Sequence, residues 1–121
     1  MKKVLLVDDS PEIIKSLTLI INEIKGLQIV ASASSGINAI RAFNLYEPDI
    51  VLLDISLANS NGIEVLSDLK SSAKPPIVIM FTNYSRESFR KTSVKLGADY
   101  FLDKTNDTDK LIDILANLAK N

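Results

Sequence analysis

The chain has 121 residues, of which 46% are hydrophobic and 24% are charged. Its length is typical of one compact domain, and its apolar fraction excludes a wholly disordered chain. The 14 basic and 15 acidic residues give a net charge of −1, so the composition lacks the excess of basic residues that is typical of nucleic-acid binding. The absence of His and Cys excludes disulfides, thiolate or imidazole catalysis, and metal sites built on those ligands. Chemistry in this chain therefore depends on carboxylates, hydroxyls, lysine and hard cations.

Short apolar runs and helical patterns alternate along the sequence. Runs rich in β-branched residues predict strands, in chain order, at residues 4–7, 28–31, 50–53 and 77–81, with a weaker one at 100–102. The first helix is expected to have Ser10 as its N-cap and Pro11 as its first residue, and to stop at Gly26. Apolar residues at helical spacing predict further helices at residues 37–46, 63–69, 85–96 and 108–119.

Strict alternation of strands and helices predicts an α/β fold in which helices cover both faces of one parallel sheet. Right-handed crossovers favour a doubly wound, three-layer αβα arrangement of five strands, for which 2-1-3-4-5 is a common order. The five units take up nearly all of the chain, so we expect one domain over residues 1–121, with no output domain among them. The longest apolar runs have about five residues, against the roughly 20 that cross a bilayer, and no signal-peptide pattern precedes them. We therefore expect a cytoplasmic protein without a membrane segment.

Polar residues follow four of the predicted strands, at the edge where ligands bind in such sheets. Asp8 and Asp9 follow the first strand, Asp54 the third, Thr82 the fourth and Lys104 the fifth. The first and third strands are neighbours in the expected order, so the three carboxylates should converge, with the other two residues approaching from the far side. Close carboxylates repel one another unless a cation lies among them, and oxygen ligands select a hard cation such as Mg²⁺. Singly, each residue is also typical of a turn, a helix cap or a solvated surface, but their joint order favours a site.

The same groups suit the transfer of a phosphoryl group to a carboxylate. An Asp beside Mg²⁺ can attack phosphorus to form an acyl phosphate, and a lysine ammonium and a hydroxyl can stabilise the phosphoryl oxygens. The motifs at residues 4–9, 54–62 and 97–104, with Thr82 between the last two, resemble the receiver domains of bacterial two-component response regulators, the CheY-like superfamily. The resemblance covers essentially the whole chain and implies the flavodoxin-like fold of that family.

The resemblance implies a role for each residue at the phosphoryl group. Asp54 would be the phosphoacceptor. Asp9 would bind Mg²⁺ directly and Asp8 through water, and Asp54 and the backbone carbonyl of Ser56 would complete the protein ligands. Lys104 would pair with the phosphoryl oxygens. The chain would thus catalyse its own phosphorylation and a slow hydrolysis of the acyl phosphate, as a signalling switch rather than a metabolic enzyme.

The resemblance also implies a conformational switch. Thr82 would swing towards the phosphoryl group, and Phe101, three residues before Lys104, would turn inward into the vacated space. A plain core aromatic would look the same at that position. The change would be read on the face formed by the fourth helix, the fifth strand and the fifth helix. The fourth predicted helix has a cationic side, typical of a solvated surface as well as of a partner site, made of Arg86, Arg90, Lys91 and Lys95.

The partners implied by the resemblance are other proteins. Since the chain has no His, the phosphoryl group would come from a phosphohistidine on a sensor histidine kinase or a phosphotransfer protein. A downstream effector protein or an output domain would read the switch, and phosphorylation would allow a dimer to form. Direct binding of nucleic acid or of a membrane is not expected.

Three positions depart from the family pattern. Thr105 follows Lys104 where the family usually has a proline after a cis peptide bond. Asn83 follows Thr82 in place of a small residue, and Ala58 replaces a common proline. None of these changes removes a chemical group from the site, so we expect them to alter rates rather than the class of reaction.

Other functions share some of these residues. An aspartate-nucleophile phosphatase of the haloacid dehalogenase type would need a second acid two residues after Asp54, where Ser56 stands. A degenerate receiver would act only as a protein-interaction module, which the intact acidic and switch positions disfavour. A flavodoxin-like cofactor carrier would need a phosphate-binding loop rich in Gly or Ser/Thr after the first strand, and none follows residues 4–7.

Overall fold

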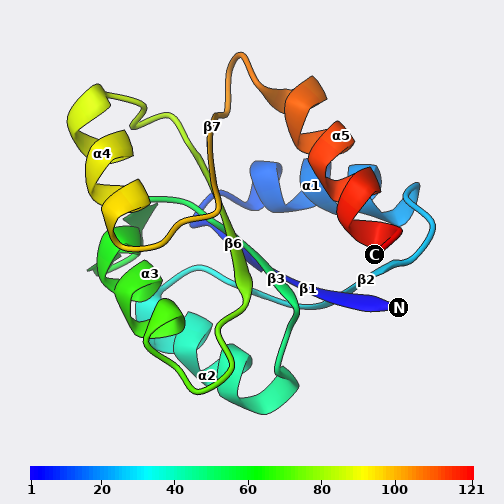
Figure 1. The fold of residues 1–121 in the computed structure, drawn as a ribbon, viewed down its shortest axis with the longest axis horizontal. Coiled ribbons are helices and arrows are strands. Elements are labelled where there is room, and N and C mark those ends of the chain that lie inside the picture. The colour runs from blue at the N-terminus through cyan, green and yellow to red at the C-terminus, as the bar shows by residue number, and fades with distance from the viewer.

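A parallel sheet of five strands forms the centre of the molecule, seen in a computed structural model that describes residues 1–121 (Figure 1). The order of the strands is β2-β1-β3-β6-β7. Their bounds are β1 (Lys2–Val7), β2 (Leu27–Ala33), β3 (Ile50–Leu53), β6 (Ile77–Thr82) and β7 (Tyr100–Asp103). These are the five predicted strands in chain order, so the doubly wound order 2-1-3-4-5 is confirmed.

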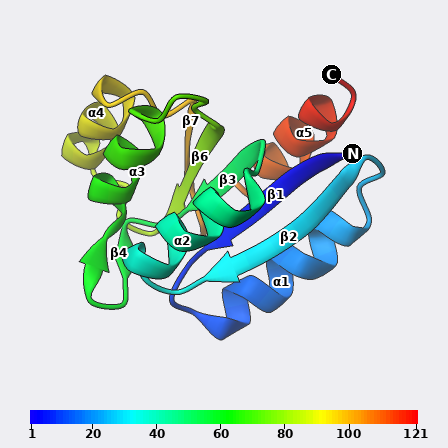
Figure 2. The ribbon, with the colours of Figure 1, turned by 90° about the horizontal axis from the view of Figure 1, so that it is seen from below.

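Helices cover both faces of this sheet, as predicted. α1 and α5 lie on one face, and α2, α3 and α4 lie on the other (Figures 1 and 2). Their bounds are α1 (Pro11–Asn22), α2 (Gly36–Tyr46), α3 (Gly62–Lys70), α4 (Glu87–Lys95) and α5 (Thr108–Ala119). No helix has both the length and the apolar character that a membrane span requires.

The sheet divides the hydrophobic core into two halves. Successive side chains of a strand point to opposite faces, so Leu5 of β1 packs with residues of α2 and α3, while Leu6 packs with residues of α1 and α5. All of β3 is buried, as expected for a strand covered on both faces. The prediction of a fully covered strand is wrong for β2, because β2 lies at the sheet edge and leaves Gln28 and Ser32 exposed.

Two helices are shorter than their sequence patterns predict. α1 begins as predicted, with the Ser10 hydroxyl accepting a hydrogen bond from the amide of Ile13. It ends at Asn22, because the next two amides bond to carbonyls three residues back and tighten the last turn. Gly26, with φ of 98°, lies in the turn that follows. α4 begins two residues later than predicted and lacks a side-chain cap.

A short hairpin between β3 and α3 has no counterpart in the sequence prediction. β4 (Ser56–Leu57) and β5 (Ser60–Asn61) pair in antiparallel fashion, and Asn59 between them has a left-handed φ of 57°. The Ser60 hydroxyl accepts a hydrogen bond of 2.7 Å from the amide of Gly36, at the start of α2. The hairpin therefore links the segment after β3 to two helices at once.

Gly62, the first residue of α3, allows that helix to approach the segment after β3. A Cβ at Gly62 would overlap the carbonyl oxygen of Asp54 and lie 2.8 Å from Cα of Ile55. Backbone atoms cannot turn aside as a side chain can. We therefore expect Gly62→Ala to lower the free energy of unfolding by about 1–3 kcal/mol, the usual cost of overpacking, in urea titrations followed by circular dichroism.

The matched control is Gly36→Ala, because Gly36 is likewise the first residue of its helix. A Cβ at Gly36 would meet side-chain atoms of Ser60 and Val65 at 3.0 to 3.2 Å, and those atoms can shift. The control should lose less stability than Gly62→Ala. Equal losses in the two variants would contradict the close-approach explanation.

Candidate functional site

Three carboxylates meet at the carboxyl edge of the sheet, as predicted. Asp8 follows β1 and Asp54 follows β3, and the amide of Asp54 donates a hydrogen bond of 3.0 Å to the carbonyl of Val7 between these neighbouring strands. Asp8 and Asp54 are each only 4% exposed, whereas Asp9 is exposed to solvent. One carboxylate oxygen from each of the three lies within 4.8 Å of the other two. The β1 and β3 ends thus form a compact acidic cluster, Asp8–Asp9–Asp54.

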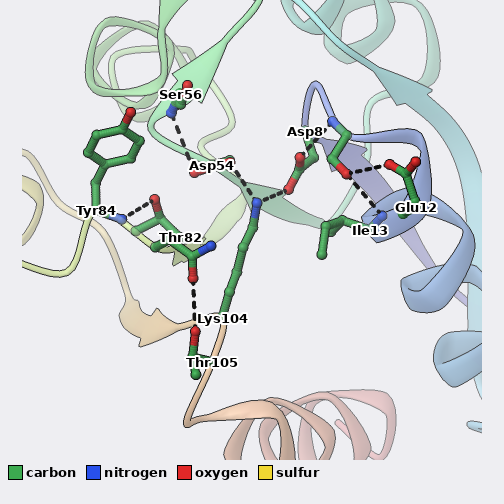
Figure 3. Close-up of polar contacts among 11 residues, drawn as sticks. Asp8, Glu12, Ile13, Asp54, Ser56, Thr82, Tyr84, Lys104 and Thr105 are labelled. Carbon is green, nitrogen blue, oxygen red and sulfur yellow. Dashed lines mark hydrogen bonds and ion pairs between the residues drawn. The ribbon is translucent and has the colours of Figure 1, made fainter.

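Lys104 lies between the two buried members of the acidic cluster. Its Nζ is 2.6 Å from Oδ2 of Asp8 and 2.7 Å from Oδ2 of Asp54 (Figure 3). Lys104 follows β7 at the sheet edge, so its side chain extends past β6 to reach the ends of β3 and β1. The peptide bond between Lys104 and Thr105 is trans. A single ammonium therefore pairs with two carboxylates that come from two other strands.

Burial and pairing shift the pKa values within the cluster. Burial raises the pKa of Asp8 above its usual 3.8, although hydrogen bonds from Lys104 and from the amide of Ser10 oppose the shift. Burial alone would lower the pKa of Lys104, but hydrogen bonds and ion pairs with Asp54 and Asp8 outweigh it and raise the pKa above its usual 10.5. Lys104 is therefore charged at neutral pH, whereas burial disfavours the ionised form of Asp8.

The charges and donors of the cluster fit a hard divalent cation. The cluster holds three carboxylates, and the one ammonium beside it pairs with two of them, so negative charge is in excess. Oδ1 of Asp8 accepts the amide of Ser10 at 2.9 Å, and Oδ1 of Asp54 has only a long contact of 3.4 Å with the amide of Ser56. The set offers carboxylate oxygens and no nitrogen or sulfur ligands, which is the chemistry that Mg²⁺ prefers.

Thr82 lies at the end of β6, between β3 and β7, and is fully buried. Its Oγ1 accepts a hydrogen bond of 3.1 Å from the amide of Tyr84 (Figure 3). Its hydroxyl donates no hydrogen bond to another protein group. The amide of Lys104 donates a bond of 3.1 Å to the Thr82 carbonyl. Thr82 therefore offers an uncommitted hydroxyl proton on the side from which Lys104 approaches.

Phe101 lies away from the carboxylates, in the half of the core that faces α2, α3 and α4. Its side chain already points inward and is 6% exposed. The guanidinium of Arg90 lies over the ring at 4.9 Å from its centroid, and Nη1 donates a bond of 3.4 Å to the Phe101 carbonyl. Three of the predicted cations of α4 are exposed, but Arg90 is half-buried. Arg90 therefore belongs with Phe101 rather than with the solvated side of α4.

Sequence reasoning missed the contribution of three residues. Ser10 is predictable as a helix cap, but its amide also holds Asp8. Gly62 belongs to the motif that carries the family resemblance, yet its contact with the Asp54 carbonyl requires the three-dimensional structure. Arg90 has the same helical spacing as its solvated neighbours, so no signal in the sequence distinguishes it.

Comparisons with known proteins find related sequences over almost the whole chain. A family model described as the response regulator receiver domain matches residues 4–116. Chemotaxis protein CheY of Halobacterium salinarum is 32% identical over 117 residues, which cover 97% of this chain and 96% of that protein. Transcriptional regulatory protein YdfI of Bacillus subtilis is 32% identical over 111 residues, which cover 92% of this chain and 52% of that protein. The chain thus spans nearly the whole of the former and about half of the latter.

Solved structures share the fold. A chain in the CheX–CheY–BeF₃–Mg²⁺ complex from Borrelia burgdorferi is 31% identical, with a TM-score of 0.87 and coverage of 97% of this chain and 88% of that one. A two-component response regulator of the LuxR family from Aurantimonas is 24% identical, with a TM-score of 0.89 and coverage of 99% and 86%.

Replacing Asp8 by the isosteric Asn tests the electrostatics of the cluster. Because the pKa of Asp8 is raised on folding, its ionisation costs stability at neutral pH, and the cost disappears as the pH falls towards 3.8. Asn keeps an oxygen that can accept the hydrogen bond from the Ser10 amide, and Lys104 keeps its ion pair with Asp54. Without added divalent cation, Asp8→Asn should therefore raise the free energy of unfolding at pH 7, with a gain that shrinks towards pH 4. Urea titrations at several pH values measure this difference.

Asp9→Asn is the control, because Asp9 carries the same charge in an exposed position. It should change the stability less than Asp8→Asn does. A gain from Asp8→Asn that is independent of pH, or no gain at pH 7, would contradict the assignment.

Proposed function

This chain belongs to the response regulator receiver family of two-component signalling, and on that basis we propose that it is a phosphorylatable switch with Asp54 as the phosphoacceptor. The observation that supports this most strongly is the convergence of Lys104 with Asp8, Asp9 and Asp54 at the carboxyl edge of the sheet. Receiver domains interact with histidine kinases and with downstream effectors, so the switch would connect two such partners.

We propose that the acidic cluster holds Mg²⁺. Asp9 would bind it directly, Asp8 through water, and Asp54 and the backbone carbonyl of Ser56 would complete the protein ligands. The excess of carboxylates over ammonium groups supports this assignment. When bound, Mg²⁺ would neutralise part of the negative charge that makes a carboxylate and a phosphoryl group repel each other.

The proposed reaction moves a phosphoryl group from nitrogen to oxygen. A carboxylate oxygen of Asp54 attacks phosphorus, the P–N bond of a phosphohistidine breaks, and the imidazole leaves on the partner protein. The partner must supply that imidazole because this chain has no His. The Lys104 ammonium already lies 2.7 Å from Oδ2 of Asp54, so it can pair with oxygens of a phosphoryl group attached there.

The proposed switch starts from the uncommitted Thr82 hydroxyl. A charge-assisted hydrogen bond to the phosphoryl group is worth roughly 1.5–3 kcal/mol, and one each from Thr82 and Lys104 would shift a two-state equilibrium by two or more decades. Phe101, held inward beneath Arg90, would transmit the change to the face formed by α4, β7 and α5. An effector protein or an output domain would read this face, and a phosphorylation-dependent dimer would use it as well.

Chemical phosphorylation tests the acceptor. Acetyl phosphate with Mg²⁺ should add one phosphoryl group to the chain, and Asp54→Asn should abolish the addition because it removes the nucleophilic carboxylate. Intact-mass spectrometry measures the product. The control is Asp68→Asn, which replaces an exposed carboxylate in α3 and should leave the addition unchanged.

Other outcomes of that experiment point to the alternatives. A mass gain that persists in Asp54→Asn would refute the acceptor assignment. Turnover of p-nitrophenyl phosphate would favour a phosphatase. The absence of both phosphorylation and Mg²⁺ binding would favour a protein-interaction module.

A phosphoryl mimic tests the switching face. Beryllofluoride with Mg²⁺ should change the backbone amide chemical shifts of α4, β7 and α5 more than those of α2, because the signal passes through Thr82 and Phe101. Heteronuclear NMR measures these shifts, and Asp54→Asn is the control without the mimic. Shift changes confined to the loops that carry the acidic cluster would contradict the proposed face.

A further inference from the structure

Two residues that depart from the family pattern are hydrogen-bonded to each other. The Thr105 hydroxyl donates a bond of 3.3 Å to Oδ1 of Asn83. Asn83 directly follows Thr82, and Thr105 directly follows Lys104. The bond therefore joins the two loops whose preceding residues would contact the phosphoryl group.

This side-chain bond lies just beyond the last backbone pairing of β6 with β7. Thr82 pairs with Asp103 at the end of β6 and β7, and the Lys104 amide donates a bond of 3.1 Å to the Thr82 carbonyl. Past this point the two loops turn away towards α4 and α5. The bond between Asn83 and Thr105 is the one side-chain hydrogen bond that spans the two loops.

The other side-chain hydrogen bonds of the loop after β7 do not reach the loop after β6. The Asp103 carboxylate accepts the amide of Asn106 at 3.0 Å, and the Asp107 carboxylate accepts the amide of Asp103 at 2.9 Å. Both bonds tie the loop after β7 back to β7 itself. They set the shape of that loop. Its position beside the loop after β6 is held by the backbone bond from Lys104 to Thr82 and, beyond it, by the side-chain bond from Thr105 to Asn83.

We propose that Asn83 and Thr105 form a positioning pair that fixes the spacing between the Thr82 hydroxyl and the Lys104 ammonium on either side of Asp54. This inference rests on the proposed function, in which both groups contact the phosphoryl group. Neither member of the pair touches the acidic cluster in a hydrogen bond or an ion pair, so each acts through its neighbour in the chain. A neutral hydrogen bond of this kind changes an equilibrium about two- to tenfold, and an exposed one lies near the lower end.

A double-mutant cycle tests the pair. Thr105→Val keeps the shape of the side chain and removes the donor, Asn83→Ala removes the acceptor, and a third variant combines both changes. The measured quantity is the rate constant for phosphorylation of Asp54 by acetyl phosphate with Mg²⁺, by quenched-flow sampling and intact-mass spectrometry. We expect each single variant to be about two- to fivefold slower, and the double variant to be no slower than the slower single one, because both changes break the same bond.

Three controls separate positioning from a general effect on the fold. Thr105→Ser restores the donor and should restore the rate, and Thr92→Val makes the same Thr-to-Val change on the exposed surface of α4 and should have no effect. The Mg²⁺ affinity and the thermal midpoint should be unchanged in all variants, because the acidic cluster and the core are intact.

The outcomes distinguish this proposal from the one it rests on. If the wild-type chain is phosphorylated on Asp54 but the effects of the two substitutions multiply, or if Thr105→Val is as fast as Thr105→Ser, the positioning pair is wrong and the proposed function stands. If the wild-type chain is not phosphorylated on Asp54, both proposals are overturned.

Discussion

Lys104 places one ammonium between the buried carboxylates of Asp8 and Asp54, and the carboxyl edge of the sheet is organised around this contact. A charge removed from water is costly unless it is paired and hydrogen-bonded, so none of the three groups is stable there alone. The three residues follow different strands, and they meet only if β1, β3 and β7 end at the same level of the sheet. The balance of charge thus depends on the order of the strands in the sheet.

The main lines of the fold follow from local sequence, because buried parallel strands require apolar runs such as residues 50–53 and amphipathic helices require a regular stripe. The end of α1 and the hairpin between β3 and α3 do not follow in the same way. The end of α1 is set by hydrogen bonds within its last turn rather than by Gly26. The hairpin strands contain two residues each, too few for any period to be recognised.

The composition of the site is also largely predictable, because Asp8, Asp54 and Lys104 follow apolar runs whose carboxyl ends must share one edge. Contacts that depend on the distance between two elements cannot be predicted from the sequence in this way. Arg90 over Phe101 and Thr105 on Asn83 join residues 11 and 22 positions apart, and neither pair has a periodic or compositional signature. Such contacts depend on the separation between α4 and β7 and on the separation between the loops after β6 and β7, which only the three-dimensional structure gives.

The parts of the site follow strands that differ in the number of neighbouring strands holding them. β1 and β3, which precede the carboxylates, each have a neighbour on both sides. β7, which carries Phe101 and precedes Lys104, lies at the margin and pairs only with β6. Displacing a marginal strand disturbs one ladder of backbone hydrogen bonds, whereas displacing an interior strand disturbs two. Asp8 and Asp54 therefore follow interior strands that are costly to displace, whereas Lys104 follows an edge strand that costs less to displace.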